Sequence, residues 1–526
     1  MSLKVRIQSV SLIFACGTAL FSDGYANLVI GSVNTLLTRI YGKDALAHRN
    51  HSTVLTSVGF AGFIVGMVSF GYLSDKIGRK FGMMVASAII LVFSGLSAAS
   101  SGAKGSVDGL LSMLSAMRFL LGIGLGAEYP CGSVSASEQS EEPGINKRAW
   151  HRWLVLSTNT MIVTGFVTAS FIPLVLLWIF GPNHLNAVWR LSLGLGVVPA
   201  FIVFLWRLNM DEPIRYKKDA MKRARIPYKL VLRRYGRSLA AISIVWLLYD
   251  MIMYVLWVSV GAPGYPNFFL LCFPKIPGKS PETFNLYSST IINNVTGGTT
   301  DLVVVFGWNV VLNLFHLPGS TLGAFAVDYL GPKNTLIIGF MAQATVSFFM
   351  SGFFVNLTNH IAGFVVVYGI FLSSLAFGPG NCTFVLASKS SPTGVRGQYF
   401  GIAAASGKLG AFIGTWIFPP MIQGSFGGSG TVRGNTGPFW VGGGIALLSA
   451  IITFFFVDPL TPGGMAREDR EFREYLEAHG YDTSQMGLGG MHSDDAEAGG
   501  GFPTLADHQG EEKTGSHASS EKVAVV

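Results

Sequence analysis

Charged residues are scarce in this chain of 526 residues: they make up 13% of the sequence, whereas hydrophobic residues make up 50%. An average soluble domain is about one quarter charged. The shortage excludes an ordinary soluble domain and indicates a chain that lies in lipid. The length leaves room for roughly a dozen membrane spans of about 20 residues each, together with their loops.

Cysteine is rarer still, and the four cysteines Cys16, Cys131, Cys272 and Cys382 are scattered. They support neither a disulfide framework nor a metal site, and no cofactor is expected. No nucleophile and base recur at catalytic spacing in the loops, so we do not expect an enzyme. The net charge of +8 is concentrated in one loop beside the membrane. Anionic lipid attracts Lys and Arg there, so nucleic acid is not an expected partner.

The apolar runs predict an all-α membrane protein with about twelve transmembrane helices. The first run carries no cleavage-site pattern and contains Asp23, so we interpret it as a retained helix rather than a signal peptide. The expected spans are residues 10–33, 53–73, 81–101, 110–134, 153–180, 189–208, 238–260, 301–327, 335–355, 361–387, 399–422 and 437–457.

A short motif occurs twice, about half a chain apart. Residues 71–80 read GYLSDKIGRK, and residues 323–333 read GAFAVDYLGPK. This repeat predicts two related six-helix bundles, which are typical of a membrane transporter. We therefore expect bundles at 1–208 and 238–457, a basic linker at 209–237, and a polar, acidic, disordered tail at 458–526.

The linker region also indicates the orientation. From Arg207 to Arg237 it holds eleven basic residues against three acidic ones, which predicts that this loop and both termini are cytosolic. The triplets that begin at Asn50, Asn294 and Asn356 then lie outside as candidate glycosylation sites. A plain loop explains each triplet equally well.

Charges inside the spans are costly, so they carry information about function. In the fourth span, RFLLGIGLGAEYP places three glycines between Arg118 and Glu128, which lets a neighbouring helix approach closely. A structural packing role explains Arg118 equally well. Glu128 is followed at once by Tyr129 and the helix-loosening Pro130, a pattern that favours a site.

The seventh span places Trp246, Asp250 and Tyr254 at positions i, i+4 and i+8, on one helix face over about 12 Å. This face suits a hydrophilic ligand, although the two aromatic residues could also simply pack. In the eleventh span Lys408 lies among small residues and cannot easily reach water. It needs an anionic partner, either Asp250 or a substrate. Asp23 in the first span completes the set.

The motifs FSDGYAN, GAEYPCGSVSASE, WLLYD and FGPGNCTFVLASKSSPTGVRGQYFGIAAASGKLGAF resemble the phosphate:proton symporter branch of the major facilitator superfamily. The chain is most similar there to the fungal glycerophosphoinositol and glycerophosphocholine permeases, up to about Asp458. The resemblance implies the major facilitator fold and protons handled by Asp23 and Glu128. It also implies a substrate pocket formed by Tyr129, Asn159, Trp246, Asp250, Tyr254 and Lys408.

Two positions depart from the inorganic phosphate symporters that the chain resembles. Those proteins have an aspartate at the position of Glu128, and an asparagine where this chain has Gly380. A missing side chain at 380 would enlarge the pocket and favour a phosphodiester with a head group. Asn381 could instead turn into the pocket as a substrate-binding residue.

The paired loops predict gates on the inner side. Asp75, Arg79 and Lys80 are expected to face Glu138 and Arg148. The counterparts in the second half are Asp328, Lys389 and Arg396, and Arg118 is grouped with these gating residues. Anchoring of the basic residues to lipid is an equal alternative, because single surface ion pairs are weak.

The sequence thus predicts proton-coupled uptake of glycerophosphodiesters, with inorganic phosphate as a further substrate, across the plasma membrane by alternating access. A proton-driven exporter of a drug or secondary metabolite is the alternative, but exporters of apolar cations have no use for the buried Lys408. A third interpretation is a nutrient sensor that transports little substrate, and the acidic tail is the only feature of the sequence that supports it.

Overall fold

The computed structural model describes residues 3–47, 51–142, 145–222, 224–257, 301–359, 361–424, 426, 431–460 and 464–487. Within these ranges twelve helical segments are long and apolar enough to cross a membrane. The all-α membrane fold expected from the apolar runs is confirmed. Asn50, Asn294 and Cys272 lie outside the described residues, whereas Asn356 is exposed on the short helix α18 (Phe354–Asn359).

The first bundle holds six spans, of which four are interrupted. The uninterrupted spans are α4 (His51–Lys76) and α5 (Arg79–Ala98). A short helix, α3 (Lys43–Ala47), precedes α4. The interrupted spans are α1 (Leu3–Gly17) with α2 (Leu20–Tyr41), α6 (Val107–Glu128) with α7 (Val134–Ser140), α8 (Trp150–Ser157) with α9 (Asn159–Phe180), and α10 (Leu185–Gly194) with α11 (Val197–Leu208).

The second bundle follows the short linker helix α12 (Ile214–Asp219). Its spans are α13 (Tyr228–Trp257), α15 (Leu302–Leu314) with α16 (His316–Leu330), α17 (Pro332–Gly352), α19 (Ile361–Leu375) with α20 (Asn381–Lys389), α21 (Arg396–Gly424) and α22 (Val432–Phe456). A last helix, α23 (Met465–Ala478), comes after the spans.

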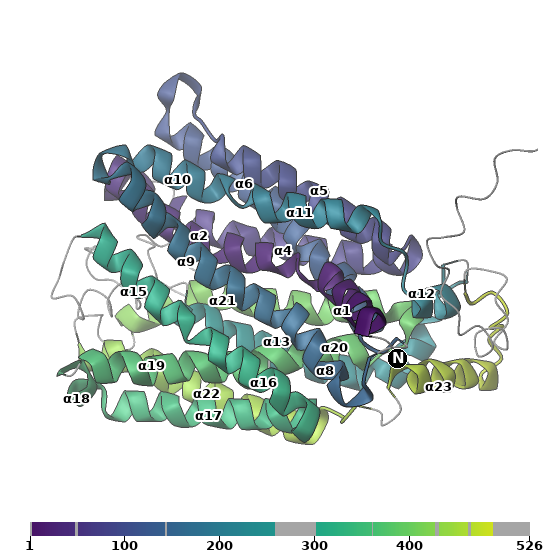
Figure 1. Ribbon diagram of the computed structural model, residues 1–526. Helices are drawn as coiled ribbons and strands as arrows, with labels where there is room; N and C mark the ends of the chain where they lie inside the picture. Colours follow the sequence, from purple (N-terminus) through teal and green to yellow (C-terminus); the bar gives the residue numbers. More distant parts are fainter. Residues whose placement is uncertain are drawn as a thin grey trace, which may run out of the picture.

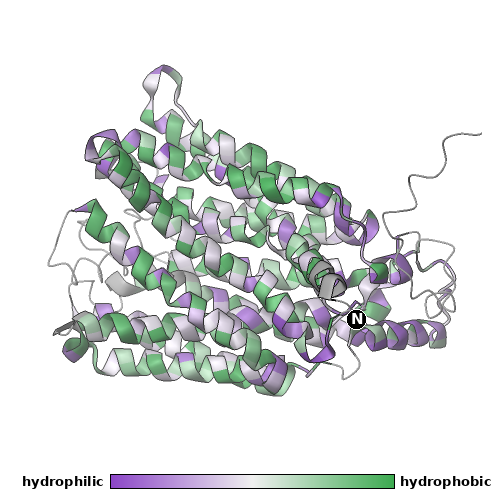
Figure 2. Ribbon diagram, viewed as in Figure 1, coloured by the Kyte–Doolittle hydropathy of each residue, from purple (hydrophilic) through white to green (hydrophobic). Residues whose placement is uncertain are grey.

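The two bundles lie side by side, the first in purple and blue and the second in green in Figure 1. They meet where α4 packs on α21 and α9 packs on α15. We call the end of the molecule that carries α12, α23 and the N-terminus the linker end. Figure 2 shows hydrophobic residues along the spans and hydrophilic residues gathered at this end.

Corresponding spans of the two bundles are broken in the same way. The fourth span has a π-helical turn at Tyr129–Ser133 that contains Pro130, and the tenth has one at Ala376–Gly380 that contains Pro379. Proline lacks the N–H that continues a helix, and π-turns occur frequently at functional sites. The duplication read from the loop motifs therefore extends into the interior of the fold.

Two predicted boundaries differ from the structure. The helix α13 begins at Tyr228, so the second part of the predicted linker 209–237 is helical. The tail, predicted to be disordered from residue 458, contains α23, whose Phe472 and Leu476 are buried. The Tyr235 hydroxyl donates a 2.5 Å hydrogen bond to Glu468 Oε1, which holds α23 against α13.

Candidate functional site

A small cavity of about 30 Å³ lies between the two bundles at mid-span. It has room for about one or two water molecules, far less than the roughly 300 Å³ or more of a site that holds an organic ligand. The cavity must therefore widen before it can hold an organic ligand. The polar and aromatic residues of the lining are Asp23, Tyr129, Asn159, Phe166, Trp246, Tyr249, Asp250, His316, Phe384 and Lys408.

Lys408 on α21 pairs with Asp250 on α13. The Nζ atom lies 3.3 Å from Asp250 Oδ2, and both side chains are buried. The two helices can approach closely because Gly407 has no side chain. A Cβ atom there would lie only 2.4 Å from the Trp246 ring. Of the two anionic partners expected for the lysine, the structure shows Asp250.

Aromatic rings surround the ammonium group of Lys408. Its Nζ atom lies 5.5 Å from the centre of the Phe63 ring and 5.4 Å from that of Tyr129. Trp246 packs against Phe384 at a centroid distance of 5.2 Å. The ring faces attract the cation and keep water away from it. The charge therefore acts in a low-dielectric setting, where it attracts an anion strongly.

Asp23 on α2 shares a partner with the lysine. The Tyr129 hydroxyl donates a 2.6 Å hydrogen bond to Asp23 Oδ2, and the Asn27 amide donates a 2.5 Å bond to Oδ1. Tyr129 thus touches both the carboxylate of Asp23 and the ammonium of Lys408. Proton uptake at Asp23 would free the tyrosine hydroxyl for another acceptor in the cavity.

Glu128 is not in the lining of the cavity, and its role in handling protons stays a prediction. Its Oε1 atom lies 2.6 Å from Arg207 Nη1 and accepts a 3.1 Å hydrogen bond from Ser87. Arg207, counted among the linker residues from the sequence, is fully buried at the end of α11 and also donates to the carbonyls of Ala15 and Cys16. This pair binds together helices of the first bundle.

Asn381 also lies behind the cavity rather than in its lining. Its Oδ1 atom accepts a 2.7 Å hydrogen bond from Asn159, which does line the cavity, and its amide donates to the Ser320 carbonyl. A Cβ atom at Gly380 would lie 2.9 Å from Asn159 Nδ2 and 3.0 Å from the Tyr249 hydroxyl. Two lining side chains therefore fill the space that the glycine leaves.

The sequence argument missed His316, the first residue of α16. It is 1% exposed and lines the cavity, and its ring lies 6.0 Å from that of Phe166. Neither ring nitrogen bonds another side chain in the described part of the chain. A histidine inside the eighth apolar run was the available signal. The side chain of Tyr254 lies outside the described residues.

Buried ion pairs join the two bundles at the linker end. Glu138 Oε1 accepts hydrogen bonds from Arg79 Nη2 at 3.2 Å and from Arg396 Nη1 at 3.0 Å, and all three side chains are fully buried. Asp75 lies 2.6 Å from Arg79 and accepts a 2.9 Å bond from each of the Gly397 and Gln398 backbone N–H groups. We call these side chains of Asp75, Arg79, Glu138 and Arg396 the clamp.

A second set of pairs lies beside the clamp and adds two residues that the sequence argument missed. Lys389 Nζ is 2.8 Å from Glu141 Oε1, and Arg152 Nε is 3.6 Å from Asp328 Oδ2. Burial acts to raise the pKa of Glu141, but the ammonium of Lys389 and the guanidinium of Arg215 bring that pKa below its usual value. Glu141 therefore stays ionised.

Three predicted gating residues lie outside these pairs. Lys80 meets Glu212 only through its backbone N–H, at 3.0 Å, and Arg148 is exposed. Arg152, one helical turn further on, instead pairs with Asp328 of α16. Arg118 lies in the first bundle and donates to the Ala26 carbonyl at 2.9 Å.

The helix α23 adds Asp469 to the clamp. Its carboxylate accepts hydrogen bonds from the Thr393 backbone N–H at 2.7 Å and hydroxyl at 2.9 Å, and lies 3.6 Å from Arg396 Nη2. Burial raises the pKa of Asp469 to about 6 even though Arg396 acts in the opposite direction. A segment predicted to be tail therefore takes part in closing the linker end.

Two bundles of six spans, broken helices at mid-span and a small polar cavity between them define a transporter of the major facilitator type. The profile of the sugar (and other) transporter family matches residues 10–236 and 281–461. The chain belongs to this family of the major facilitator superfamily.

Curated relatives match over most of both chains. A glycerophosphocholine permease of Candida albicans is 43% identical, over 93% of this chain and 86% of its own. The glycerophosphoinositol transporter 1 of Saccharomyces cerevisiae is 32% identical, with the same coverage. The inorganic phosphate transporter PT2 of Toxoplasma gondii is 30% identical, over 86% of this chain and 73% of its own.

Solved structures show the same fold. The proton:xylose symporter XylE bound to 6-bromo-6-deoxy-D-glucose superposes with a TM-score of 0.67 at 19% identity, over 90% of this chain and all of that one. At this identity the likeness concerns the fold alone.

Proposed function

We propose that this carrier imports glycerophosphodiesters across the plasma membrane together with protons, by alternating access. The observation that carries the proposal is the buried Lys408–Asp250 pair in a small cavity lined by aromatic residues. A desolvated anion needs a compensating charge and hydrogen-bond donors. Lys408 supplies the charge, and the hydroxyls of Tyr129 and Tyr249 with the amide of Asn159 supply donors. The permease relatives transport compounds of this class.

The phosphate group and the head group would occupy different parts of the cavity. Lys408 and Tyr129 take the phosphate near Asp23 and Asp250. His316, whose ring nitrogens bond no other side chain among the described residues, faces the same cavity from α16. A ring nitrogen can donate to or accept from a hydroxyl. We therefore propose that His316 binds the polar head group. The cavity must widen to admit this group.

Charge balance couples the anion to protons. The described lining carries two carboxylates, Asp23 and Asp250, and one ammonium, Lys408. A singly charged phosphodiester would raise the buried net charge from −1 to −2, and each uncompensated buried charge costs several kcal/mol. Protonation of Asp23 restores the balance and also frees the Tyr129 hydroxyl for the substrate. External acid would therefore load the carrier.

The linker end would face the cytosol, since its basic residues follow the positive-inside rule. The clamp then closes the inner side while the carrier loads from outside. Entry of substrate and proton would break the Lys408–Asp250 pair, bring the bundles together on the outer side and open the clamp.

Uptake of labelled glycerophosphoinositol, which carries the single negative charge of its phosphodiester, by cells that express the carrier tests the proposal. Lys408→Ala should lower uptake by more than about 100-fold, because a broken buried pair costs about 3 to 5 kcal/mol and the anion loses its countercharge. Lys229→Ala, at an exposed position of α13, is the control. Surface expression is measured for both variants. Unchanged uptake in Lys408→Ala, or accumulation that a proton ionophore leaves intact, would favour the exporter interpretation instead.

A further inference from the structure

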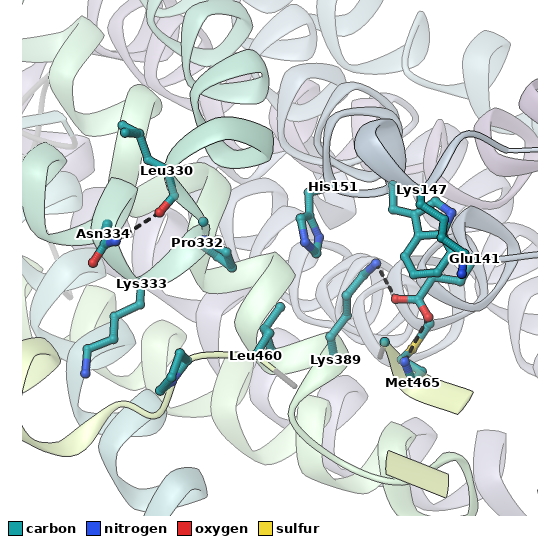
Figure 3. Close-up of a pocket in the computed structure, with 14 residues that line it drawn as sticks. Glu141, Lys147, His151, Leu330, Pro332, Lys333, Asn334, Lys389, Leu460 and Met465 are labelled. Carbon is teal, nitrogen blue, oxygen red and sulfur yellow. Dashed lines mark hydrogen bonds and ion pairs between the residues drawn. The ribbon is translucent and has the colours of Figure 1, made fainter. Parts of the chain in front are cut away.

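A second and larger cavity, of about 430 Å³, opens at the linker end, away from the central site. This volume lies in the range of sites that hold a small molecule. Figure 3 shows its lining: Lys389, Glu141 and Lys147 lie on one side, Leu330, Pro332 and Lys333 on the other, and His151 lies between them. Lys147 and Asn334 are exposed, so a solute can reach the cavity from the surface.

The charge of the lining is positive. Lys147, Lys333 and Lys389 stand against the single carboxylate of Glu141, which gives a net charge of about +2 with His151 neutral. Glu141 already accepts bonds from Lys389 at 2.8 Å and from the Met465 N–H at 2.8 Å. Because this carboxylate is already engaged, no acidic side chain of the lining compensates the positive charges of Lys147 and Lys333.

Hydrogen-bond donors in the lining also favour an anion. The first turn of α17 (Pro332 to Asn334) lines the cavity; Pro332 has no N–H, and the N–H groups of Lys333 and Asn334 have no acceptor within the helix. The Trp150 Nε1 and His151 Nδ1 atoms are buried and bond nothing among the residues that the structure describes. An indole N–H can only donate, so it calls for an acceptor.

We propose that this cavity binds a doubly charged phosphomonoester. A phosphomonoester carries about −1.5 to −2 charges at neutral pH, which matches the lining, whereas a phosphodiester carries one. Beyond the phosphate the cavity offers apolar walls at Leu330, Pro332 and Leu460 for the rest of the ligand. Lys333, now turned toward the Phe454 ring at 5.9 Å, reaches the cavity by rotation of its flexible stem.

Such a ligand would regulate the carrier. Lys147 and His151 belong to the first bundle, and Lys333 and Lys389 belong to the second. An anion held by both bundles stabilises the state in which the linker end is closed, since a ligand favours the conformation that binds it best. This regulatory role rests on the proposed function. Hydrolysis of an imported glycerophosphodiester releases an alcohol and glycerol phosphate, which is a phosphomonoester. The site would then slow import when this product accumulates.

The test uses the full-length carrier in phosphatidylcholine nanodiscs at fixed ionic strength, with glycerol 3-phosphate as the probe. The central site is saturated with glycerophosphocholine, and the measurement is repeated in Lys408→Ala, so that failure of the proposed import and failure of this site are told apart. We expect one remaining binding site. Lys147→Gln with Lys333→Gln should weaken it by about 100-fold, or tenfold for each charge-assisted bond.

Lys229→Gln removes the same charge at the same end of the molecule and should leave binding unchanged, and arginine at 147 and 333 should restore it. Nanodiscs with phosphatidic acid, whose head group is also a phosphomonoester, form a second arm. If added glycerol 3-phosphate has no effect in these nanodiscs, phosphatidic acid already occupies the site, and the ligand is a lipid. In proteoliposomes, trapped glycerol 3-phosphate should slow uptake about tenfold only where both lysines are present. Equal binding by the double glutamine variant and the parent would overturn the proposal.

Discussion

Glu138 offers the sharpest test of the clamp, because one of its oxygen atoms serves both bundles. Glu138→Gln keeps the size of the side chain but removes the charge between two fully buried guanidinium groups. Breaking a buried pair costs about 3 to 5 kcal/mol. Asp75 and Asp469 still compensate Arg79 and Arg396, so we take the lower value, about 3 kcal/mol.

This cost falls mainly on the state with the linker end closed, because the contact between Glu138 and Arg396 joins the two bundles, whereas the contact between Glu138 and Arg79 lies within the first bundle. A shift of about 3 kcal/mol changes the ratio of closed to open carriers by roughly 100-fold. A carrier that is mostly closed at this end would become mostly open. Uptake should fall, since the carrier then rarely faces outward, while the protein stays folded.

Pulsed electron resonance between spin labels measures the opening directly. Arg148→Cys on the first bundle and Asn334→Cys on the second place labels at exposed positions of the linker end, outside the clamp. Glu471→Gln is the matched control, because Glu471 pairs with Arg467 and Arg234 at partly exposed positions, where an ion pair contributes at most about 1 kcal/mol. A distance distribution that Glu138→Gln leaves unchanged, in a monodisperse sample, would refute the clamp.

Three further expectations concern the acids and the glycine. Asp23→Asn should keep exchange of glycerophosphocholine but make uptake nearly independent of external pH, and a preserved pH slope contradicts the role of Asp23. Gly380→Asn should push Asn159 and Tyr249 into the cavity and favour phosphate over the diester by about tenfold in competition assays; equal loss of both counts against it. The lowered pKa of Glu141 means that its ion pair stabilises the fold above the unfolded pKa, about 4.3. The melting-temperature gap between parent and Glu141→Gln should stay constant from about pH 7.5 to 5.5 and shrink below about pH 4.

The sequence predicts well what depends on local chemistry. Hydropathy locates the spans, and a lysine among glycines in an apolar run must find a partner, which made the approach of Lys408 to Asp250 foreseeable. It predicts poorly which way a side chain points. Glu128 adjoins Tyr129 in the sequence, yet consecutive residues of a helix point in different directions, and the two side chains meet different neighbours. Only the packing of α11 shows that Arg207 receives the carboxylate.

The helix α23 was missed for a different reason. It is strongly polar, so a search for apolar runs passes over it. Its buried residues Glu468, Phe472 and Leu476 recur every four positions, which is the period of one helix face. An amphipathic reading of residues 465–478 would have predicted a helix that packs on the linker end. The position of Asp469 beside Arg396 depends on tertiary packing and stays beyond such a reading.

The charge count of the cavity also bears on the choice between substrates. With Asp23, Asp250 and Lys408 ionised, the described lining carries −1. A phosphodiester needs one proton to leave that charge unchanged, whereas a doubly charged phosphate needs two, because each uncompensated charge in the closed cavity costs several kcal/mol. Two acids are present to accept them, but Asp250 can take a proton only by giving up its contact with Lys408, the cation that holds the anion. The arrangement therefore favours a singly charged anion over a doubly charged one, and this preference follows from charge alone.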